Sequence, residues 1–455
     1  MGLNFATSDN VPYVAKCLEF GVRMNNRDSS LNPLRIGMAG LGMIFEETYL
    51  PVFDRLAGES LHDRMIRPMT VELSATLSRT GSRSALYRDH LGFASAKHFL
   101  SSDGFAPFLD ACDAVCVATP DDRHFELAKA ALSAGKHVLI EKPSVLSVDQ
   151  LDQLCSIAWQ NGVLARVVYH KLADPDHKKL RTHVIDGNLN HVNSGYCTLL
   201  EPKQISLGQF SEWIGGRNPG TYVAVHYIKL IDFTFGSCSG QNWKLNRISC
   251  TGQRGIVRPA SGDTWDSVQL RMEYLYPDGR EACFDIHTSW VNPDNFCGYV
   301  DQEAQFRFDN GIWLSHQRKR GVELSIEGKT PSILKETPNH HYNSEAIDPW
   351  GYRSKKGYGL EVIERFFIEC AMVKQSDSVP ARNNVLSEIR SMGYAALEAE
   401  RNVVAVVQAM EAILASHAQG FPGGVVFVDD PLGGLVLRLP GGPPPVLLYQ
   451  PMIQG

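Results

Sequence analysis

The sequence predicts a protein with an α/β domain and an α+β domain. An N-terminal doubly wound parallel sheet precedes a larger, mostly antiparallel sheet covered on one face by helices. The 455 residues exceed the ~250–300 at which a single hydrophobic core stops growing. From Leu34 to His170, strand-like and helix-like segments alternate, which indicates βαβ units. Beyond His170, alternating apolar and polar residues are broken by Gly, Pro, Asp and Asn, which is typical of antiparallel strands.

The elements of the first domain follow in a regular order. Strands are predicted at residues 34–40, 70–78, 113–120, 137–143 and 163–170, and helices at 46–58, 83–92, 122–135 and 147–162. Ser147 suits the N-cap of the last helix, because its hydroxyl can accept a bond from a free N–H of the first turn, and Gly162 suits its C-cap.

The second domain is predicted from six strands and two returning helices. The strands are expected at residues 192–201, 242–252, 267–279, 281–291, 303–315 and 321–328, and the helices at 360–375 and 387–419. We therefore divide the chain into an N-terminal extension (1–33), a doubly wound domain (34–170), an α+β domain (171–416) and a C-terminal tail (417–455). The tail contains "GFPGG" and "PGGPPP", which predict an irregular or partly disordered segment, with an arm onto a neighbouring subunit as the alternative.

Composition narrows the class of partner. The net charge is -6 and no block of like charges stands out, so no nucleic-acid groove and no membrane surface is expected. No apolar run approaches the ~18–20 residues of a membrane span, and the first thirty residues lack the pattern of a signal peptide. Ten scattered cysteines fit reduced thiols, and the His340–His341 pair lacks a neighbouring metal ligand, so no metal is expected. A cytoplasmic protein with a small-molecule partner is predicted.

A glycine-rich turn follows the first strand, in "RIGMAGLGMIFEE". Gly37, Gly40 and Gly42 would let the backbone approach a pyrophosphate, and the N–H groups at the helix start, from Met43 and Ile44 onward, would favour its charge. The pattern predicts a dinucleotide-binding Rossmann domain. Phe45 departs from the fingerprint, which has a small residue there, so we expect the helix to pack further from the strand.

The end of the second strand indicates which dinucleotide binds. NAD favours an acidic residue here, but "TVELSATLSRTGSR" has Ser78 and Arg79. A guanidinium suits a 2′-phosphate, so NADP is favoured over NAD. The alternative is that both residues are solvated loop residues and the cofactor is NAD.

In the segment "HVLIEKPS", two charged residues directly follow the apolar residues of a predicted buried strand. Val138 to Ile140 are apolar β-formers, but Glu141 and Lys142 follow directly. At the carboxyl end of a parallel strand these side chains face the ligand crevice, and burial there lowers the pKa of a lysine toward a useful range.

With these pieces placed, the chain resembles the glucose–fructose oxidoreductase / inositol dehydrogenase (Gfo/Idh/MocA) family over about residues 34–416. Four segments carry the resemblance: "IGMAGLGMI", "VCVATPDDRHFELAKAALSAGKHVLIEKPSV", "VVYHKLADPDHKKLRTHVIDGNL" and "GTYVAVHYIKLIDFTFG". The resemblance implies that Lys142 lies beside the nicotinamide and the substrate. It further implies that Thr119, Pro120 and His124 line the cofactor crevice with Glu141, and that Lys171 touches cofactor or substrate. Asp121 stands where the family often has Asn, and His124 could instead only cap its helix.

The fourth segment usually supplies an Asp and, four residues later, a His. Here the His position aligns on His226, but the Asp position holds Tyr222. A second register would place Lys229 at the His position and Val225 at the Asp position. His226 and Lys229 are three residues apart on a helix, so both are expected to point into one site. His226 is the preferred general base or acid, with Tyr222 and Lys229 positioning the substrate.

The resemblance implies an NAD(P)-dependent dehydrogenase or reductase acting on a secondary hydroxyl, or a ketone, of a sugar, glycoside or cyclitol. Residues 171–416 would bind the substrate and support a homodimer or homotetramer. Two alternatives remain: a redox-neutral enzyme that cleaves or epimerises glycosides with a bound dinucleotide, and a non-catalytic NAD(P)-sensing regulator.

Overall fold

The computed structural model describes residues 32–211, 213–237, 242–294, 300–317, 324–327, 333–336, 341–351, 353–429 and 433–451. The predicted N-terminal extension up to residue 31 and His340 lie outside the described residues. In the described part of the chain, no helix combines the length and the apolar composition that crossing a membrane requires.

The first sheet has six parallel strands in the order β5-β4-β1-β6-β7-β8. Their bounds are β1 Leu34–Ala39, β4 Val71–Ser78, β5 Lys97–Leu100, β6 Ala114–Val117, β7 His137–Ile140 and β8 Ala165–Val167. This is the doubly wound order: strands are added to one side of β1 as far as β5, and from β6 onward to its other side. A ligand crevice is therefore expected outside the carboxyl ends of β1 and β6, where the order of the strands switches. The predicted parallel sheet is confirmed.

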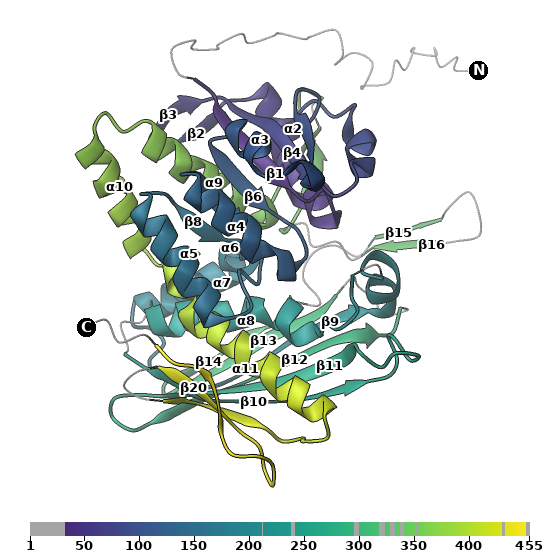
Figure 1. The fold of residues 1–455 in the computed structure, drawn as a ribbon, viewed down its shortest axis with the longest axis vertical. Helices are drawn as coiled ribbons and strands as arrows, with labels where there is room; N and C mark the ends of the chain where they lie inside the picture. Colours follow the sequence, from purple (N-terminus) through teal and green to yellow (C-terminus); the bar gives the residue numbers. More distant parts are fainter. Residues whose placement is uncertain are drawn as a thin grey trace, which may run out of the picture.

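Helices cover both faces of the first sheet (Figure 1). Side chains of α3 (Ala106–Asp110), α4 (His124–Ser133) and α5 (Val148–Gln160) share one buried cluster with the sheet. Side chains of α2 (Leu50–Gly58) and α9 (Tyr358–Lys374) share another. The N-cap prediction is confirmed, because the Ser147 hydroxyl accepts a bond from Gln150 N, and Gly162 adopts φ +57° directly after the helix end.

Several local features differ from expectation. The helix predicted at residues 83–92 is a short 3₁₀ turn, Ser82–Tyr87, and β5 follows it. A hairpin of β2 (Leu61–Asp63) and β3 (Ile66–Met69) precedes β4. Such short pieces lack enough residues to show a period in the sequence.

The second sheet has nine strands in the order β14-β13-β9-β12-β11-β10-β19-β20-β21. Their bounds are β9 Val192–Pro202, β10 Lys244–Arg254, β11 Trp265–Leu275, β12 Glu281–Asn292, β13 Asp301–Phe308, β14 Gly311–Ser315, β19 Val425–Asp429, β20 Gly434–Arg438 and β21 Val446–Tyr449. Only the β9–β12 pair is parallel, so the sheet is mixed and mostly antiparallel, as predicted. Helices α8 (Val225–Ile231) and α11 (Arg401–Ala418) lie between this sheet and the first domain (Figure 1).

The prediction of an irregular tail is wrong for residues 425–429, 434–438 and 446–449, which form strands. β19 pairs with β10, and β20 and β21 continue the sheet beyond it. Val426, Leu435 and Leu437 are buried there, and the Tyr449 hydroxyl donates to Asp152 of α5 at 2.6 Å. The short apolar pieces form strands because the edge of β10 is available for pairing, which composition alone does not reveal.

Two further predicted elements are arranged differently. The segment 387–419 is not one helix: α10 (Val379–Ser391) ends before a turn, and α11 begins at Arg401. Between them Gly393 and Ala395 have positive φ, and Ala395 O accepts a bond from Val167 N of β8. β15 (Leu324–Glu327) pairs with β16 (Ile333–Glu336) as a separate hairpin rather than in the large sheet.

The remaining short elements are α6 His170–Ala173, α7 Pro175–Ile185, β17 Ser344–Ile347, β18 Arg353–Lys356, 3₁₀ turns at Ser101–Asp103, Asp121–Arg123 and Leu397–Glu400, and π-helical turns at Phe45–Tyr49, Ile205–Gln209, Gly220–Ala224 and Asp232–Ser237.

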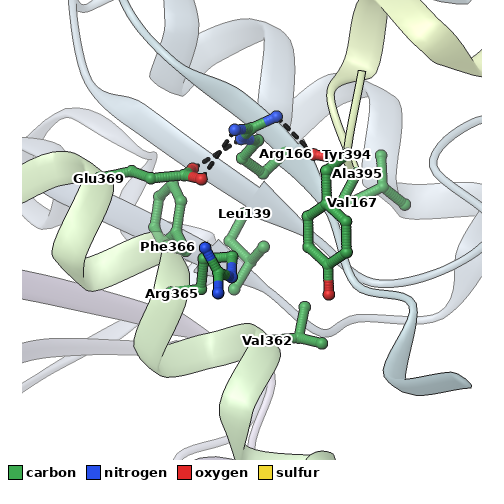
Figure 2. Close-up of a pocket in the computed structure, with 9 residues that line it drawn as sticks. All are labelled: Leu139, Arg166, Val167, Val362, Arg365, Phe366, Glu369, Tyr394 and Ala395. Atoms are coloured by element: carbon green, nitrogen blue, oxygen red, sulfur yellow. Dashed lines mark hydrogen bonds and ion pairs between the residues drawn. The ribbon is translucent and has the colours of Figure 1, made fainter. Parts of the chain in front are cut away.

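A buried ion pair fastens α9 to the first sheet. Figure 2 shows Arg166 of β8 between Glu369 and the carbonyl of Tyr394. The Arg166 Nε–Glu369 Oε2 distance is 2.7 Å, and both side chains are almost fully buried. A small pocket opens beside this pair, lined among others by Leu139, Val362 and Phe366. None of its lining residues belongs to the set predicted from the sequence to bind cofactor or substrate.

Candidate active site

The glycine turn lies at the carboxyl end of β1, beside the end of β6. Gly40 has φ +93°, and a Cβ on it would lie 2.3 Å from Ala118 O, so only glycine fits. A Cβ on Gly37 would lie 2.8 Å from Cys112 Sγ, so this position is packed against the core. No atom lies within 4 Å of a Cβ built on Gly42. The open space at Gly42, directly before the helix that starts at Met43, leaves room for a pyrophosphate at the helix N–H groups.

Phe45, the departure from the fingerprint, is fully buried in an aromatic cluster. Its ring centroid is 5.1 Å from that of Tyr87 and 6.0 Å from that of Phe93. The helix turn that carries it, Phe45–Tyr49, is π-helical. This cluster accounts for a large side chain at a position where the fingerprint has a small one.

Two arginines, Arg79 and Arg83, follow the end of β4. Ser78 Oγ accepts a bond from Gly81 N at 3.0 Å, and Arg79 is exposed. Arg83 Nη1 lies 3.5 Å from Leu41 O, within the glycine turn itself. No local pattern marks Arg83, because nothing in the sequence shows that the 3₁₀ turn brings it back to the turn after β1.

His124 joins the ends of β6 and β7. Its Nδ1 lies 2.8 Å from Pro143 O and its Nε2 lies 2.8 Å from Thr119 O. The imidazole is buried, and burial lowers its pKa. The hydroxyl of Thr119 is buried with no hydrogen-bond partner among the described residues. A buried polar group usually finds a partner, so Thr119, which precedes Pro120 at the strand end, points to a bound ligand.

Glu141 is directed to the helix that follows the glycine turn. Its Oε1 accepts a hydrogen bond from the Tyr49 hydroxyl at 2.9 Å, and the residue is buried. Burial raises the pKa of Glu141 to about 7, although the Lys142 charge and the Tyr49 bond oppose the shift. Glu141 therefore links the end of β7 to the helix after the glycine turn, and its charge favours the protonated form of Lys142.

The ammonium of Lys142 reaches across to the second domain. Nζ donates to Tyr222 O at 2.9 Å and lies 3.9 Å from the centroid of the Tyr222 ring. Burial lowers the pKa of Lys142, while the charges of Glu141, Glu201 and Asp121 oppose that shift. A lysine so placed gives up its proton more readily than an exposed one.

Tyr222 and His226 flank Lys142 on the second-domain side. The Tyr222 ring packs against Phe210 and Trp213, with centroid distances of 5.2 Å and 5.1 Å. His226 Nδ1 is buried with no hydrogen-bond partner among the described residues. Burial holds the pKa of His226 well below 6.5, and the Lys142 charge lowers it further. The imidazole is therefore uncharged at neutral pH and free to accept a hydrogen bond.

Lys229, which the sequence places in the same site as His226, has its ammonium bound to another element. Its Nζ lies 2.7 Å from Glu400 Oε1, and both side chains are fully buried. Almost every residue of α8 is buried, so this helix has no single exposed side. Residues three apart on it therefore contact different neighbours. Lys171 is also held elsewhere: its ammonium donates to Gln302 and Gln317 and lies 4.8 Å from the Tyr227 ring.

Three residues that sequence reasoning missed complete the site. Glu201, at the end of β9, accepts a bond from Trp290 Nε1 at 2.9 Å. Burial raises the pKa of Glu201 to about 7, while the Lys142 charge opposes the shift. Arg217 Nε lies 2.9 Å from Asp121 Oδ1, which clamps a loop of the second domain to the end of β6. No local signal marks these residues, since each meets its partner across 89 or more positions of sequence.

Comparison with known proteins agrees with this geometry. Residues 34–169 match the family model described as "Oxidoreductase family, NAD-binding Rossmann fold" (GFO_IDH_MocA). The chain is 28% identical over 168 residues to dTDP-3,4-didehydro-2,6-dideoxy-alpha-D-glucose 3-reductase of Actinomadura kijaniata; the match covers 36% of this chain and 45% of the relative. It is 28% identical over 130 residues to scyllo-inositol 2-dehydrogenase (NADP(+)) IolU of Bacillus subtilis; this match covers 28% of this chain and 38% of the relative. The chain thus spans less than half the length of these curated relatives.

The likeness of fold extends much further than the likeness of sequence. The crystal structure of GenD2 from gentamicin A biosynthesis, in complex with NAD, superposes with a TM-score of 0.60 at 18% identity, covering 88% of this chain and 97% of that chain. At this identity the superposition shows the fold, including both sheets. Residues 34–169 therefore form an NAD(P)-binding Rossmann domain that matches the Gfo/Idh/MocA family of oxidoreductases, and the doubly wound strand order and the glycine turn agree with that match.

Proposed function

We propose that this protein is an NAD(P)-dependent dehydrogenase or reductase that acts on a secondary hydroxyl, or the matching ketone, of a sugar, glycoside or cyclitol. The observation that carries the proposal is the position of Lys142. Its ammonium lies at the carboxyl end of β7, over the ring of Tyr222, where the first domain meets the second. The named activities of the two curated relatives, on a nucleotide-linked deoxysugar and on an inositol, support this substrate class.

The residues at the crevice fit a dinucleotide. The open space at Gly42, the close approach at Gly40 and the unpartnered Thr119 hydroxyl support its binding along the turn and the β6 end. Gly40, Gly42, Met43 and Ile44 would hold the pyrophosphate, whereas Gly37 keeps the strand packed against Cys112. A second group would line the nicotinamide half: Thr119, Pro120, His124, Glu141 and Lys142. When bound, the nicotinamide would accept or supply the hydride.

Selection of NADP over NAD is proposed for the residues after β4. The exposed guanidinium of Arg79 is available to a 2′-phosphate, and Arg83 lies beside the glycine turn. Arg binds phosphate through two parallel hydrogen bonds, which a ribose hydroxyl cannot match.

The chain's own groups would handle the substrate proton. The uncharged His226 would accept a hydrogen bond from the reacting hydroxyl and take its proton in the oxidative direction. The ammonium of Lys142 would stabilise the negative charge that develops on that oxygen. Tyr222, with Phe210 and Trp213, would offer an aromatic face to the apolar side of a sugar ring.

We also propose a homodimer or homotetramer through the open face of the large sheet. Ile312 and Leu314 of edge strand β14 are exposed there, 60% and 44%. A monomer mass in light scattering would exclude this assembly.

The test of the function begins with the purified protein. Mass spectrometry identifies any co-purifying nucleotide, and the absorbance of reduced nicotinamide is followed with sugars, glycosides and inositols in both directions. We expect Lys142→Met to lower turnover by at least about 100-fold, since losing one group that stabilises the developing oxyanion costs about 10²–10³-fold. Lys97→Met is the matched control, because Lys97 is exposed on edge strand β5.

The outcomes separate the alternatives. Turnover by Lys142→Met at the wild-type rate would contradict the proposal. Consumption of a glycoside without net change in reduced nicotinamide would establish the redox-neutral alternative. Binding of a sugar that alters dinucleotide affinity, with no turnover of any compound, would establish the sensing alternative.

A further inference from the structure

His170 lies at the same edge of the first sheet as Lys142. Val168 N donates to Ile140 O at 2.9 Å, so β7 and β8 are paired up to this point. Lys142 stands two residues beyond Ile140, and His170 stands two residues beyond Val168, at the start of α6. Because the two strands are parallel, both residues leave the sheet at its carboxyl edge, where the ligand crevice of a doubly wound sheet lies.

The imidazole of His170 lies next to that of His226, which belongs to the second domain. The two ring centroids are 6.4 Å apart, and the ring planes are inclined by 39°. His226 follows Tyr222 by four residues, about one helical turn, and the Tyr222 carbonyl accepts the hydrogen bond from Lys142 at 2.9 Å. Lys142, His170 and His226 therefore lie close together where the two domains meet.

The ring nitrogens of these two histidines have unused hydrogen-bonding capacity. Both nitrogens of His170, and Nδ1 of His226, are buried with no hydrogen-bond partner among the described residues, and His170 is only 5% exposed. Buried polar groups are nearly always hydrogen-bonded, so these nitrogens indicate a bound ligand. Burial and the Lys142 charge lower the pKa of His170 to about 3, although the nearby Gly359 backbone opposes the shift. An uncharged imidazole offers one N–H donor and one acceptor nitrogen.

Tyr342 packs against the His170 ring and is itself held in place. The two ring centroids are 5.6 Å apart, with the ring planes nearly perpendicular at 88°. Tyr342 O accepts a bond from Gly359 N at 2.8 Å, and a Cβ on Gly359 would lie 2.6 Å from Cε2 of the tyrosine. The next residue, Asn343, donates to Glu47 O at 2.7 Å, on the helix after the glycine turn. The His170 ring is thus fixed by packing while its nitrogens stay available.

We propose that His170 is a specificity-determining residue that binds a hydroxyl on a carbon next to the reacting one. The substrate then carries a vicinal diol or, in the reductive direction, an α-hydroxy ketone. This inference rests on the proposed dehydrogenase function and narrows its substrate class. The reacting hydroxyl has a single hydrogen, which His226 accepts in that function, so the acceptor nitrogen of His170 requires a second O–H group. Hydrogen bonds of about 2.8 Å from two adjacent hydroxyls fit between imidazoles whose centroids are 6.4 Å apart.

The test compares the alcohol found by the substrate screen with its deoxy analogues, each lacking the hydroxyl on one carbon next to the reacting one. We expect the wild type to turn over one of these analogues with kcat/KM about 10- to 100-fold lower, because an imidazole nitrogen is then left unpaired. His170→Phe keeps a ring and loses both nitrogens. It should lower kcat/KM for the alcohol by a similar factor and leave that for the same analogue within about threefold of the wild type.

A structural role for His170 predicts a different pattern, in which His170→Phe lowers kcat/KM equally for the alcohol and for the analogue. His170→Asn retains a donor and an acceptor, so it should keep most of the discrimination. His137→Phe is the matched control and should keep all of it. His137 is buried too and accepts a bond from Leu164 N at 2.9 Å, but it lies at the opposite end of β7 from Lys142. Circular dichroism verifies folding, and His170→Met replaces His170→Phe if the latter does not fold.

Nuclear magnetic resonance of protein labelled with ¹⁵N in its histidine rings gives a second readout. The His170 signals are assigned by their absence from His170→Phe. We expect them to be those of an uncharged ring between pH 5 and 8, and to move when the alcohol is added to protein that holds the reduced cofactor, with which the alcohol cannot react. The His137 signals should not move. A His170 ring that becomes charged in this range, or signals that the alcohol leaves in place, would overturn the proposal.

The two levels of hypothesis fail differently. If an alcohol is oxidised but has no neighbouring hydroxyl, or if His170→Phe discriminates against the deoxy analogue as the wild type does, the role of His170 is wrong and the dehydrogenase function stands. If no compound changes the nicotinamide absorbance of the wild type, the proposed function is wrong and the role of His170 falls with it.

Discussion

The Arg217 clamp offers a quantitative test of how the two domains are held around the crevice. Arg217 Nε lies 2.9 Å from Asp121 Oδ1, and Nη2 lies 2.9 Å from Asp122 Oδ1. The Asp121 side chain is 7% exposed, while that of Asp122 is 54% exposed. The substitution Arg217→Met removes the cation and keeps most of the side-chain volume.

The size of the effect follows from these two environments. Losing an exposed pair such as Arg217–Asp122 costs about 0–1 kcal/mol. Removing one partner of a buried pair costs about 3–5 kcal/mol, because the other charge stays buried. Asp121 Oδ1 keeps a bond from Asp122 N at 3.0 Å, which moderates that cost. We therefore expect Arg217→Met to lower the free energy of unfolding by about 3 kcal/mol.

A double-mutant cycle isolates the pair. Asp121→Asn removes the buried charge and keeps an oxygen acceptor of the same size, so it should cost only about 1 kcal/mol. In the Asp121→Asn background, Arg217→Met should add little, which gives a coupling free energy of about 2 kcal/mol between the two positions. Urea unfolding followed by circular dichroism measures all four proteins. Arg217→Met within about 0.5 kcal/mol of the wild type, or strictly additive effects, would refute the reasoning.

Two further predictions concern charge and cofactor. Burial raises the pKa of Glu141 from 4.5 to about 7, so the folded protein holds this proton more tightly than the unfolded chain. The contribution of Glu141 to stability is full below pH 4.5 and is lost as the pH rises through about 7. The difference in free energy of unfolding between the wild type and Glu141→Gln, measured by urea unfolding, should therefore shift by up to about 3 kcal/mol between pH 4.5 and 8. A difference that does not change with pH would contradict this. Arg79→Ala should weaken NADPH binding at least about tenfold and leave NADH binding unchanged, measured by nicotinamide fluorescence, since a lost charge-assisted bond to phosphate costs about 1.5–3 kcal/mol. Equal loss for both nucleotides would show that Arg79 does not read the 2′-phosphate.

Features set by short-range pattern could be predicted from the sequence. The parallel sheet followed from alternating strand and helix segments, and the Ser147 cap and the Gly40 turn followed from local backbone requirements. Lys142 could be placed as well, because the carboxyl ends of parallel strands meet at one edge whatever the rest of the chain does.

Features that depend on distant partners could not be predicted in the same way. The spacing of His226 and Lys229 suggested a shared site, but α8 is enclosed on its flanks, and Glu400 captures the lysine. The tail was expected to be irregular, yet the free edge of β10 pairs with it.

By itself the sequence determined the doubly wound first domain, the family that this domain matches and the lysine at the end of β7. Only the tertiary structure decided what that lysine contacts. Tyr222 and Arg217 belong to the second domain, and their contacts with Lys142 and Asp121 result from packing that domain against the first. Local patterns record which element a segment forms, because that choice depends on near neighbours, whereas contacts between elements depend on the whole core.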